Sequence, residues 1–78
     1  DNVNHRCDIY ALGVMLYEMV TGRPPFYEGN IEYQHLHNEP PEITRPIGKP
    51  LRQVILRCLQ KDPDKRFQTV EEIMSRIV

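Results

Sequence analysis

The longest apolar stretch of the chain runs from Ile9 to Val20, where every residue except Glu18 is apolar, aromatic or glycine. A helix of this composition is hydrophobic on nearly all sides, so the stretch predicts a buried central helix over about residues 8–21. Gly13 lies inside this helix, although glycine costs a helix interior about 1 kcal/mol relative to alanine. We therefore expect another backbone to pack closely against the helix at Gly13.

Both ends of this predicted helix carry residues typical of helix termini. Asp8 is a suitable N-cap, because its short carboxylate can accept hydrogen bonds from the N–H groups of the first turn. Gly22 suits the left-handed position that follows a helix, and Pro24 and Pro25 cannot continue it. Residues 1–7 are polar and aperiodic, and are expected to form a lead-in loop.

The clearest amphipathic pattern lies between residues 50 and 60. Apolar residues recur there at i, i+3, i+4, i+7 and i+8, and they are Leu51, Val54, Ile55, Cys58 and Leu59. This spacing predicts a helix with one buried face, for which Pro50 is a suitable first residue. The residues expected on the solvent side are Arg52, Gln53, Arg57 and Gln60.

A second amphipathic pattern predicts a last helix over about residues 69–78. Thr69 and Glu72 form a capping box, in which each side chain accepts a hydrogen bond from the backbone N–H of the other residue. The apolar residues expected to form its buried stripe are Val70, Ile73, Met74 and Ile77. The sequence stops at Val78 with no C-cap, so we expect this helix to be cut short.

The segment between residues 22 and 49 is less regular. Asn30 can cap a short helix through about residue 38, whose poorly segregated apolar residues are typical of a peripheral helix held by tertiary contacts. Residues 39–49 contain three prolines and Gly48, and are expected to form a loop. No stretch alternates as a strand does. The sequence therefore predicts an all-α fold of four helices, at about 8–21, 30–38, 50–60 and 69–78, with no sheet.

Composition and charge exclude several classes of function. The 78 residues suffice for one domain, and 40% hydrophobic and 27% charged residues are typical of a globular chain. The formal net charge of −1 gives no electrostatic basis for binding nucleic acid or an anionic membrane. No apolar run approaches the ~20 residues that span a bilayer.

The histidines and cysteines do not predict a metal site. His35 and His37 are two positions apart and point to different faces of a helix. Cys7 and Cys58 have no metal-ligand spacing, and we expect both to be reduced thiols. Cys58 falls on an apolar helix face, where it is expected to act as a small buried hydrophobe.

Two motifs resemble those of protein kinases. Asp8–Gly13, with the letters DIYALG, has the Asp-x-Trp/Tyr-x-x-Gly pattern of the central helix of the kinase large lobe, with Tyr10 in the aromatic position. Lys61–Phe67, with the letters KDPDKRF, is similar to the Asp-Pro-x-x-Arg signature of the same family. Thr21–Phe26 and Tyr33–His35 are further similar to bacterial eukaryote-like serine/threonine kinases.

The resemblance implies structural roles for three residues. Asp8 would hydrogen-bond the backbone of the catalytic loop, and Gly13 is the glycine of the same motif. Arg66 would pair with a glutamate upstream of this sequence. From the residues alone, Asp8 is an N-cap and Arg66 is a solvated surface residue.

The resemblance also makes the helix at 30–38 a docking surface for substrates and regulators. The candidate docking residues are Tyr33, Leu36 and His37. Ordinary surface packing of this helix is the alternative.

The parts that carry out phosphoryl transfer do not occur in these 78 residues. They are a glycine-rich loop, a strand lysine, a catalytic aspartate and the magnesium-binding residues. The resemblance therefore implies that residues 1–78 are a C-terminal subdomain of a serine/threonine kinase catalytic domain, inactive alone and without catalytic, cofactor-binding or metal-binding residues. The alternative is a non-catalytic, pseudokinase-derived binding module.

For the parent kinase, the resemblance implies ATP and magnesium as cofactors and a cytoplasmic kinase domain, with or without a membrane anchor elsewhere. The implied partners are the remainder of the kinase domain and protein substrates. The isolated chain would leave apolar residues of the central helix uncovered, so we expect it to self-associate.

Overall fold

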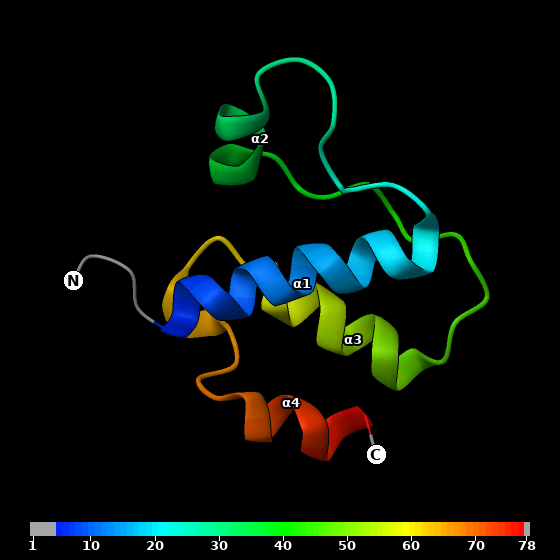
Figure 1. Cartoon of the computed structure of the whole chain (residues 1–78), viewed down its shortest axis with the longest axis vertical. Coiled ribbons are helices and arrows are strands. Elements are labelled where there is room, and N and C mark those ends of the chain that lie inside the picture. Colours follow the sequence, from blue (N-terminus) through cyan, green and yellow to red (C-terminus); the bar gives the residue numbers. More distant parts are fainter. Residues whose placement is uncertain (1–4, 78) are drawn as a thin grey trace.

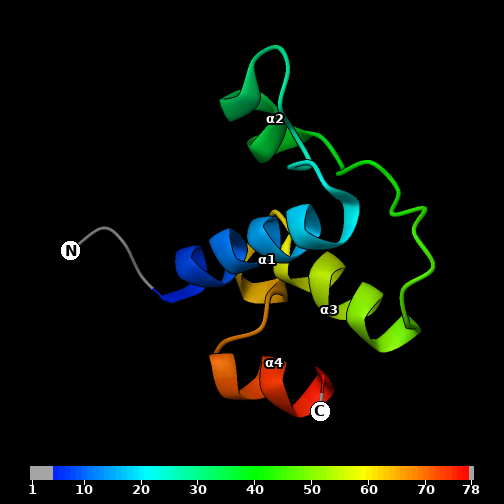
Figure 2. The same cartoon turned by 45° about the vertical axis from the view of Figure 1, so that its right-hand side comes forward.

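The computed structural model describes residues 5–77, and for residues 5 and 6 it describes the backbone only. The elements, in chain order, are α1 (His5–Thr21), α2 (Ile31–His37), α3 (Lys49–Cys58), the 3₁₀ helix η1 (Pro63–Lys65) and α4 (Val70–Ile77). The described part of the chain contains no strand, so the predicted all-α fold of four helices is confirmed. In Figures 1 and 2, α1 and α3 lie side by side, with α2 on one side of this pair and α4 on the other.

The arrangement of the helices is flat. The principal extents are 37 × 35 × 16 Å, and the smallest of these is little more than the ~10–12 Å diameter of one helix with its side chains. A layer this thin can enclose few side chains on all sides. Most helices of the chain therefore bury one face and leave the others exposed.

The core forms where α1 crosses α3. All the buried apolar residues except Phe26 fall into two groups, which are Ile9, Val54, Cys58, Phe67 and Ile73, and Tyr17, Ile43, Ile55 and Leu59. Each group contains residues of both α1 and α3. Burial of a large apolar side chain contributes about 1.5–3 kcal/mol, so this contact is the main source of stability in the fold.

The start of α1 differs from the sequence prediction. The helix begins at His5, so residues 5–7 are helical, and the predicted lead-in loop can hold only for residues 1–4, which lie outside the described part. Asp8 is consequently a residue of the first turn and not the N-cap. The helix extends further because no proline or glycine precedes Asp8 to stop it. The predicted C-terminus is confirmed, since Gly22 adopts a left-handed φ of 86° after Thr21.

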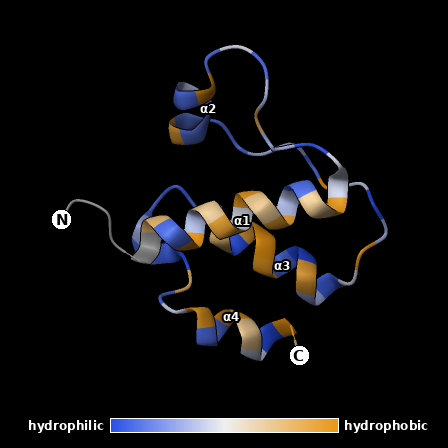
Figure 3. Cartoon of the chain, viewed as in Figure 1, coloured by the Kyte–Doolittle hydropathy of each residue, from blue (hydrophilic) through white to orange (hydrophobic). Residues whose placement is uncertain are grey.

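The prediction that α1 is buried on nearly all sides is wrong for this chain. Ile9 and Tyr17 are buried, but Met15 is 59% exposed and Met19 is 75% exposed. Figure 3 shows hydrophobic residues along the whole of α1. The helix packs on α3 along one side and contacts α2 through Tyr10, but no described element covers Met15 and Met19.

The prediction of a buried apolar stripe is confirmed more fully for α3 than for α4. On α3, Val54, Ile55 and Cys58 are buried as predicted, together with Leu59 directly after the helix. On α4, only Ile73 of the predicted stripe is buried, so the prediction of a buried stripe is wrong for the exposed residues, which are Val70, Met74 and Ile77. The residue Val78 of the predicted helix lies outside the described part.

Two of the residues expected on the solvent side of α3, Arg52 and Arg57, are half-buried, and Arg57 lies over the Phe67 ring. Arg52 was expected in solvent, but it is half-buried and donates to the carbonyl oxygens of Ile43 and Arg45 in the preceding loop. The loop backbone has few partners of its own, and the guanidinium supplies several donors in one plane. Arg52 thereby fastens the loop to α3.

Candidate functional site

The side chain of Arg66 is buried, with 8% of its surface exposed. Its Nε donates to the carbonyl oxygen of Gln60 at 2.6 Å, and its Nη2 donates to that of Lys61 at 3.2 Å. These carbonyls follow the C-terminus of α3, where backbone acceptors lack helical partners. The guanidinium carbon lies 4.7 Å from the centre of the Tyr10 ring. Arg66 thus connects the turn after α3 to α1, and the alternative of a solvated arginine is wrong.

Tyr10 also connects α1 to α2. Its hydroxyl lies 2.7 Å from Nδ1 of His35, and the two rings meet edge to face at 5.5 Å. His35 makes a second edge-to-face contact with Phe26 at 5.0 Å. The Lys61 ammonium lies 4.9 Å from the centre of the Phe26 ring and donates to the carbonyl oxygen of Gln34 at 3.2 Å. The short helix α2 is therefore held mainly through the side of His35.

Burial shifts the titration of the groups around Tyr10. It raises the pKa of Tyr10, although the charge of Arg66 opposes the rise. It lowers the pKa of His35, and the charge of Lys61 lowers that pKa further. Burial lowers the pKa of Lys61 as well, with Glu39 acting in the opposite direction. A neutral His35 can accept the hydrogen bond of the Tyr10 hydroxyl, whereas an imidazolium cannot.

A cavity of about 200 Å³ opens beside these contacts. The residues that line it are Cys7, Tyr10, His35, Leu36, Lys61 and Arg66. It brings together two of the residues singled out in the sequence, since Arg66 and the exposed docking candidate Leu36 both line it. No carboxylate lies among its lining residues.

Gly13 lies at a close approach of α1 and α3. A Cβ at Gly13 would lie 2.6 Å from Cβ of Cys58, and 3.2 Å from Cδ2 of Leu59. Side chains do not tolerate a contact as short as the first, so the close packing expected at this glycine is present.

Burial also raises the pKa of the Cys58 thiol to about 11. Cys58 is thus a buried, protonated thiol, as its helix face predicted.

Asp8 lies on the exposed side of the first turn of α1, two residues before Tyr10. No hydrogen bond or ion pair among the described residues engages its carboxylate. The structure therefore does not bring Asp8 and Arg66 into contact with each other, and of the two only Arg66 packs on Tyr10 among the described contacts.

The three docking candidates are all exposed residues of α2, a helix without buried residues. Tyr33 and Leu36 are exposed large side chains, and the ring of Tyr33 stacks at 4.6 Å on that of His37. The predicted N-cap is confirmed, because Oδ1 of Asn30 accepts from the backbone N–H of Tyr33. A docking role for this surface stays a prediction.

Two kinds of feature do not occur in the described part of the chain. Among residues 5–77, no group of three or more histidine, cysteine, aspartate or glutamate side chains is placed to hold a metal ion. None of the described helices is both long enough and apolar enough to cross a bilayer.

Comparison with known proteins gives a consistent result along the whole chain. The family model described as "Protein kinase domain" matches residues 1–77. The chain belongs to the protein kinase family. It is 39% identical to the serine/threonine-protein kinase PknB of Mycobacterium tuberculosis, a match that covers 100% of this chain and 13% of PknB.

Other bacterial kinases are similar to the same extent. The chain is 38% identical to a probable serine/threonine-protein kinase of Streptomyces coelicolor, over 94% of this chain and 12% of that protein. It is 36% identical to a probable serine/threonine-protein kinase of Clostridium acetobutylicum, over 96% of this chain and 12% of that protein. The chain thus spans about one eighth of the length of the curated relatives it matches. The resemblance to bacterial eukaryote-like serine/threonine kinases is confirmed.

Sequence reasoning missed the part that Tyr10 and His35 play in this segment of a kinase domain. Tyr10 was noted only as the aromatic residue of a motif, and His35 only as a poor metal ligand. The contacts that make them important join residues 25 positions apart. Tyr10 lies in an apolar stretch and His35 in a weakly amphipathic helix. Neither local pattern indicates that the two side chains form a hydrogen bond with each other.

Proposed function

We propose that this chain is the C-terminal helical subdomain of a serine/threonine protein kinase that transfers the γ-phosphate of ATP to protein serine or threonine. The proposal is supported by serine/threonine kinases that match 94% to 100% of the chain. Within the kinase domain, the chain supports the catalytic loop and has no kinase activity alone. The remainder of the kinase domain and the protein substrates are its partners, and the kinase domain acts in the cytoplasm.

One observation most directly supports the proposed role of this chain in holding the catalytic loop. The Asp8 carboxylate is exposed and unengaged among the described residues, while the helix that carries it is tightly held. Gly13 packs against Cys58 on α3, and Arg66 holds the turn after α3 against Tyr10. A carboxylate fixed in this way can accept hydrogen bonds from a neighbouring loop at little entropic cost.

ATP and magnesium belong to the proposal for the parent kinase and not to this chain. The described residues do not fit a magnesium site, since no suitable group of carboxylates occurs among them. Neither motif of the chain is a phosphate-binding loop. We assign both ligands to other parts of the kinase domain.

The first test is a phosphotransfer assay on the parent kinase with Asp8→Asn and Arg66→Ala. Loss of a charge-assisted hydrogen bond is worth about 1.5–3 kcal/mol, so we expect Asp8→Asn to lower kcat roughly ten- to hundredfold without unfolding the protein. Arg66→Ala leaves two backbone carbonyls without their donor and should lower both activity and stability. Circular dichroism melts separate the two effects.

The matched controls are Glu18→Gln, an exposed carboxylate on the same helix, and Arg45→Ala, an exposed arginine in the loop. Both should leave kcat unchanged.

In the same assay, Leu36→Ala should raise KM for a protein substrate at constant kcat if α2 is a docking surface. A parent protein that transfers no phosphate before any mutation would instead support the pseudokinase-derived binding module.

We also propose that the isolated chain self-associates through the uncovered side of α1. Met15 and Met19 are more than half exposed there, next to other apolar residues of the helix. Sedimentation of the 78-residue chain should show a dimer or larger species that Met15→Glu together with Met19→Glu converts to monomer. A monodisperse wild-type monomer with a sharp cooperative melt contradicts this proposal.

A further inference from the structure

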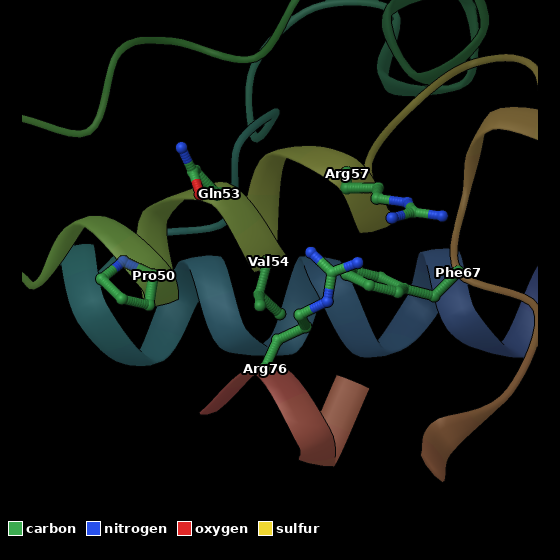
Figure 4. Close-up of a pocket in the computed structure, with 6 residues that line it drawn as sticks. All are labelled: Pro50, Gln53, Val54, Arg57, Phe67 and Arg76. Atoms are coloured by element: carbon green, nitrogen blue, oxygen red, sulfur yellow. The ribbon is translucent and has the colours of Figure 1, made fainter. Parts of the chain in front are cut away.

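A second cavity, of about 260 Å³, lies between α3 and α4, away from the contacts around Tyr10. Figure 4 shows the side chains that line it, which are Pro50, Gln53, Val54, Arg57, Phe67 and Arg76. Two of the six are cations and none is an acid. The cavity therefore has a strongly positive polar part beside an apolar part.

The two arginines meet over one aromatic ring. Arg57 belongs to the last turn of α3, and Arg76 to the last turn of α4. Their guanidinium carbons lie 4.3 Å and 5.9 Å from the centre of the buried Phe67 ring. In Figure 4 the two side chains come from different helices and converge on this ring.

Stacking on Phe67 does not use the N–H groups of either guanidinium. A cation over a ring is attracted through its flat face, so its in-plane donors stay available for hydrogen bonds. Within the described residues, neither the Arg57 guanidinium nor the Arg76 guanidinium makes a hydrogen bond or an ion pair. The fold thus holds both guanidiniums over the same ring, and among the described residues it gives neither of them an acceptor.

We propose that this cavity binds the phosphoryl group of a phosphorylated serine or threonine in a protein segment. A phosphoryl group carries a charge of about −1.5 to −2 near neutral pH and offers three acceptor oxygens, which matches two guanidiniums better than a singly charged carboxylate does. This inference goes beyond the proposed kinase function and does not depend on it.

The size and the apolar part of the cavity favour a peptide over other phosphate compounds. Its volume lies below the ~300–1,000 Å³ of typical small-molecule sites, so it suits one side-chain head group and not a whole nucleotide. The Gln53 amide has both a donor and an acceptor, as the pairing of a peptide backbone requires. Pro50 and Val54 offer apolar contact to a neighbouring aliphatic side chain of the segment.

The test is a fluorescence-polarisation titration of the full-length protein, dephosphorylated beforehand and without ATP. The probes are short fluorescein-labelled degenerate peptide libraries with phosphothreonine or phosphoserine fixed at the centre, and the same libraries with threonine or glutamate there. We expect binding to a phosphorylated library only. Arg57→Gln and Arg76→Gln should each weaken it about tenfold, as the loss of one charge-assisted partner predicts.

Two further sets of variants guard against a purely structural effect. Arg57→Lys and Arg76→Lys keep the charge over Phe67 but lose the planar pair of donors, so they should fall between wild type and the glutamine variants. Arg23→Gln is the matched control, because Arg23 also stacks on a ring, that of Tyr27 at 5.3 Å, outside the cavity. It should bind as wild type does, and thermal melts confirm that each variant is folded.

Several outcomes would overturn the proposal. They are equal binding of phosphorylated and unphosphorylated libraries, no phosphate-dependent binding, and binding that survives the double variant Arg57→Gln with Arg76→Gln. Equal binding of the glutamate library would make this a carboxylate site. Competition by inorganic phosphate as strong as that by the phosphopeptides would make it a site for free phosphate. Arginine-dependent binding of phosphatidic acid vesicles without peptide binding would make it a lipid site.

Discussion

The helices α3 and α4 both have apolar stripes in the sequence but different surroundings in the structure. On α3, Ile55 has no exposed surface, because α1 lies along that face. On α4, Ile77, the last residue of the stripe, is 44% exposed, and Ile73 alone among the stripe residues is buried. Figure 2 shows α3 between α1 and α4, whereas α4 lies at the edge.

The difference shows what an amphipathic pattern does and does not determine. Periodic apolar residues favour a helix and select the face that can be buried. The extent of burial depends on how many neighbours reach that face, and a layer 16 Å thick supplies few. Among the described residues, α3 packs extensively against both α1 and α4, whereas α4 packs extensively against α3 alone.

The largest expected effect tests this difference directly. Ile55→Ala should lower the free energy of unfolding of the chain by about 2–5 kcal/mol, because it leaves a cavity in the core. Ile77→Ala should lower it by less than about 1 kcal/mol, since much of that side chain is already in water. Urea denaturation at low protein concentration measures both.

A matched pair of valines checks the result. Val54 on α3 is 2% exposed and Val70 on α4 is 51% exposed, so Val54→Ala should cost clearly more than Val70→Ala. Equal costs within each pair would mean that the α4 stripe is covered in solution, and the comparison of the two helices would then fail.

A smaller effect is expected where α1 meets α3. Gly13→Ala improves helix propensity by about 1 kcal/mol, but the new Cβ would lie 2.6 Å from that of Cys58. Overpacking of this kind costs about 1–3 kcal/mol or more, so we expect net destabilisation in thermal or urea unfolding.

Two variants show whether contact is the cause. Gly48→Ala places a Cβ at an ordinary 3.7 Å from its nearest neighbour, and should change stability by no more than about 0.5 kcal/mol. In the Gly13→Ala background, Cys58→Gly removes the clashing atom and should cost less than it does in wild type. Simple additivity of the two changes would rule out the proposed close contact.

The smallest effect concerns α2, which is held by side-chain contacts and not by a buried stripe. Burial lowers the pKa of His35 in the folded chain, so the unfolded chain binds its proton more readily. The contribution of His35 to stability is therefore complete above its ordinary pKa of about 6.5, and is lost as the pH falls through the lower folded value.

Urea midpoints between about pH 7.5 and 5.5 test this dependence. His35→Gln can still accept a hydrogen bond from Tyr10 but does not titrate, so it should flatten the loss of stability towards low pH. His37→Gln is the control, because the His37 ring lies on the exposed side of α2 against Tyr33. An unchanged slope in His35→Gln would exclude His35 as the titrating group.

Much of the fold could be predicted from local signals. The capping box formed as expected, since Oε1 of Glu72 accepts from the backbone N–H of Thr69, and the hydroxyl of Thr69 accepts from that of Glu72. The left-handed Gly22 and the Asn30 cap were equally local and equally predictable. Gly13 correctly indicated close packing. Glycine is unfavourable inside a helix, so its presence there suggests that a neighbouring element occupies the space that a side chain would fill.

The sequence by itself determined the four helices, most of their ends, the face of α3 that is buried and the protein kinase family. These depend on residues within one or two turns of each other, or on motifs that can be read directly. Only the tertiary structure decided that Arg66 is buried against Tyr10, that Arg57 and Arg76 meet over Phe67, and that α4 stays largely uncovered. Such contacts join distant residues, and their free energy depends on which surfaces the fold brings together and how much water it excludes from them.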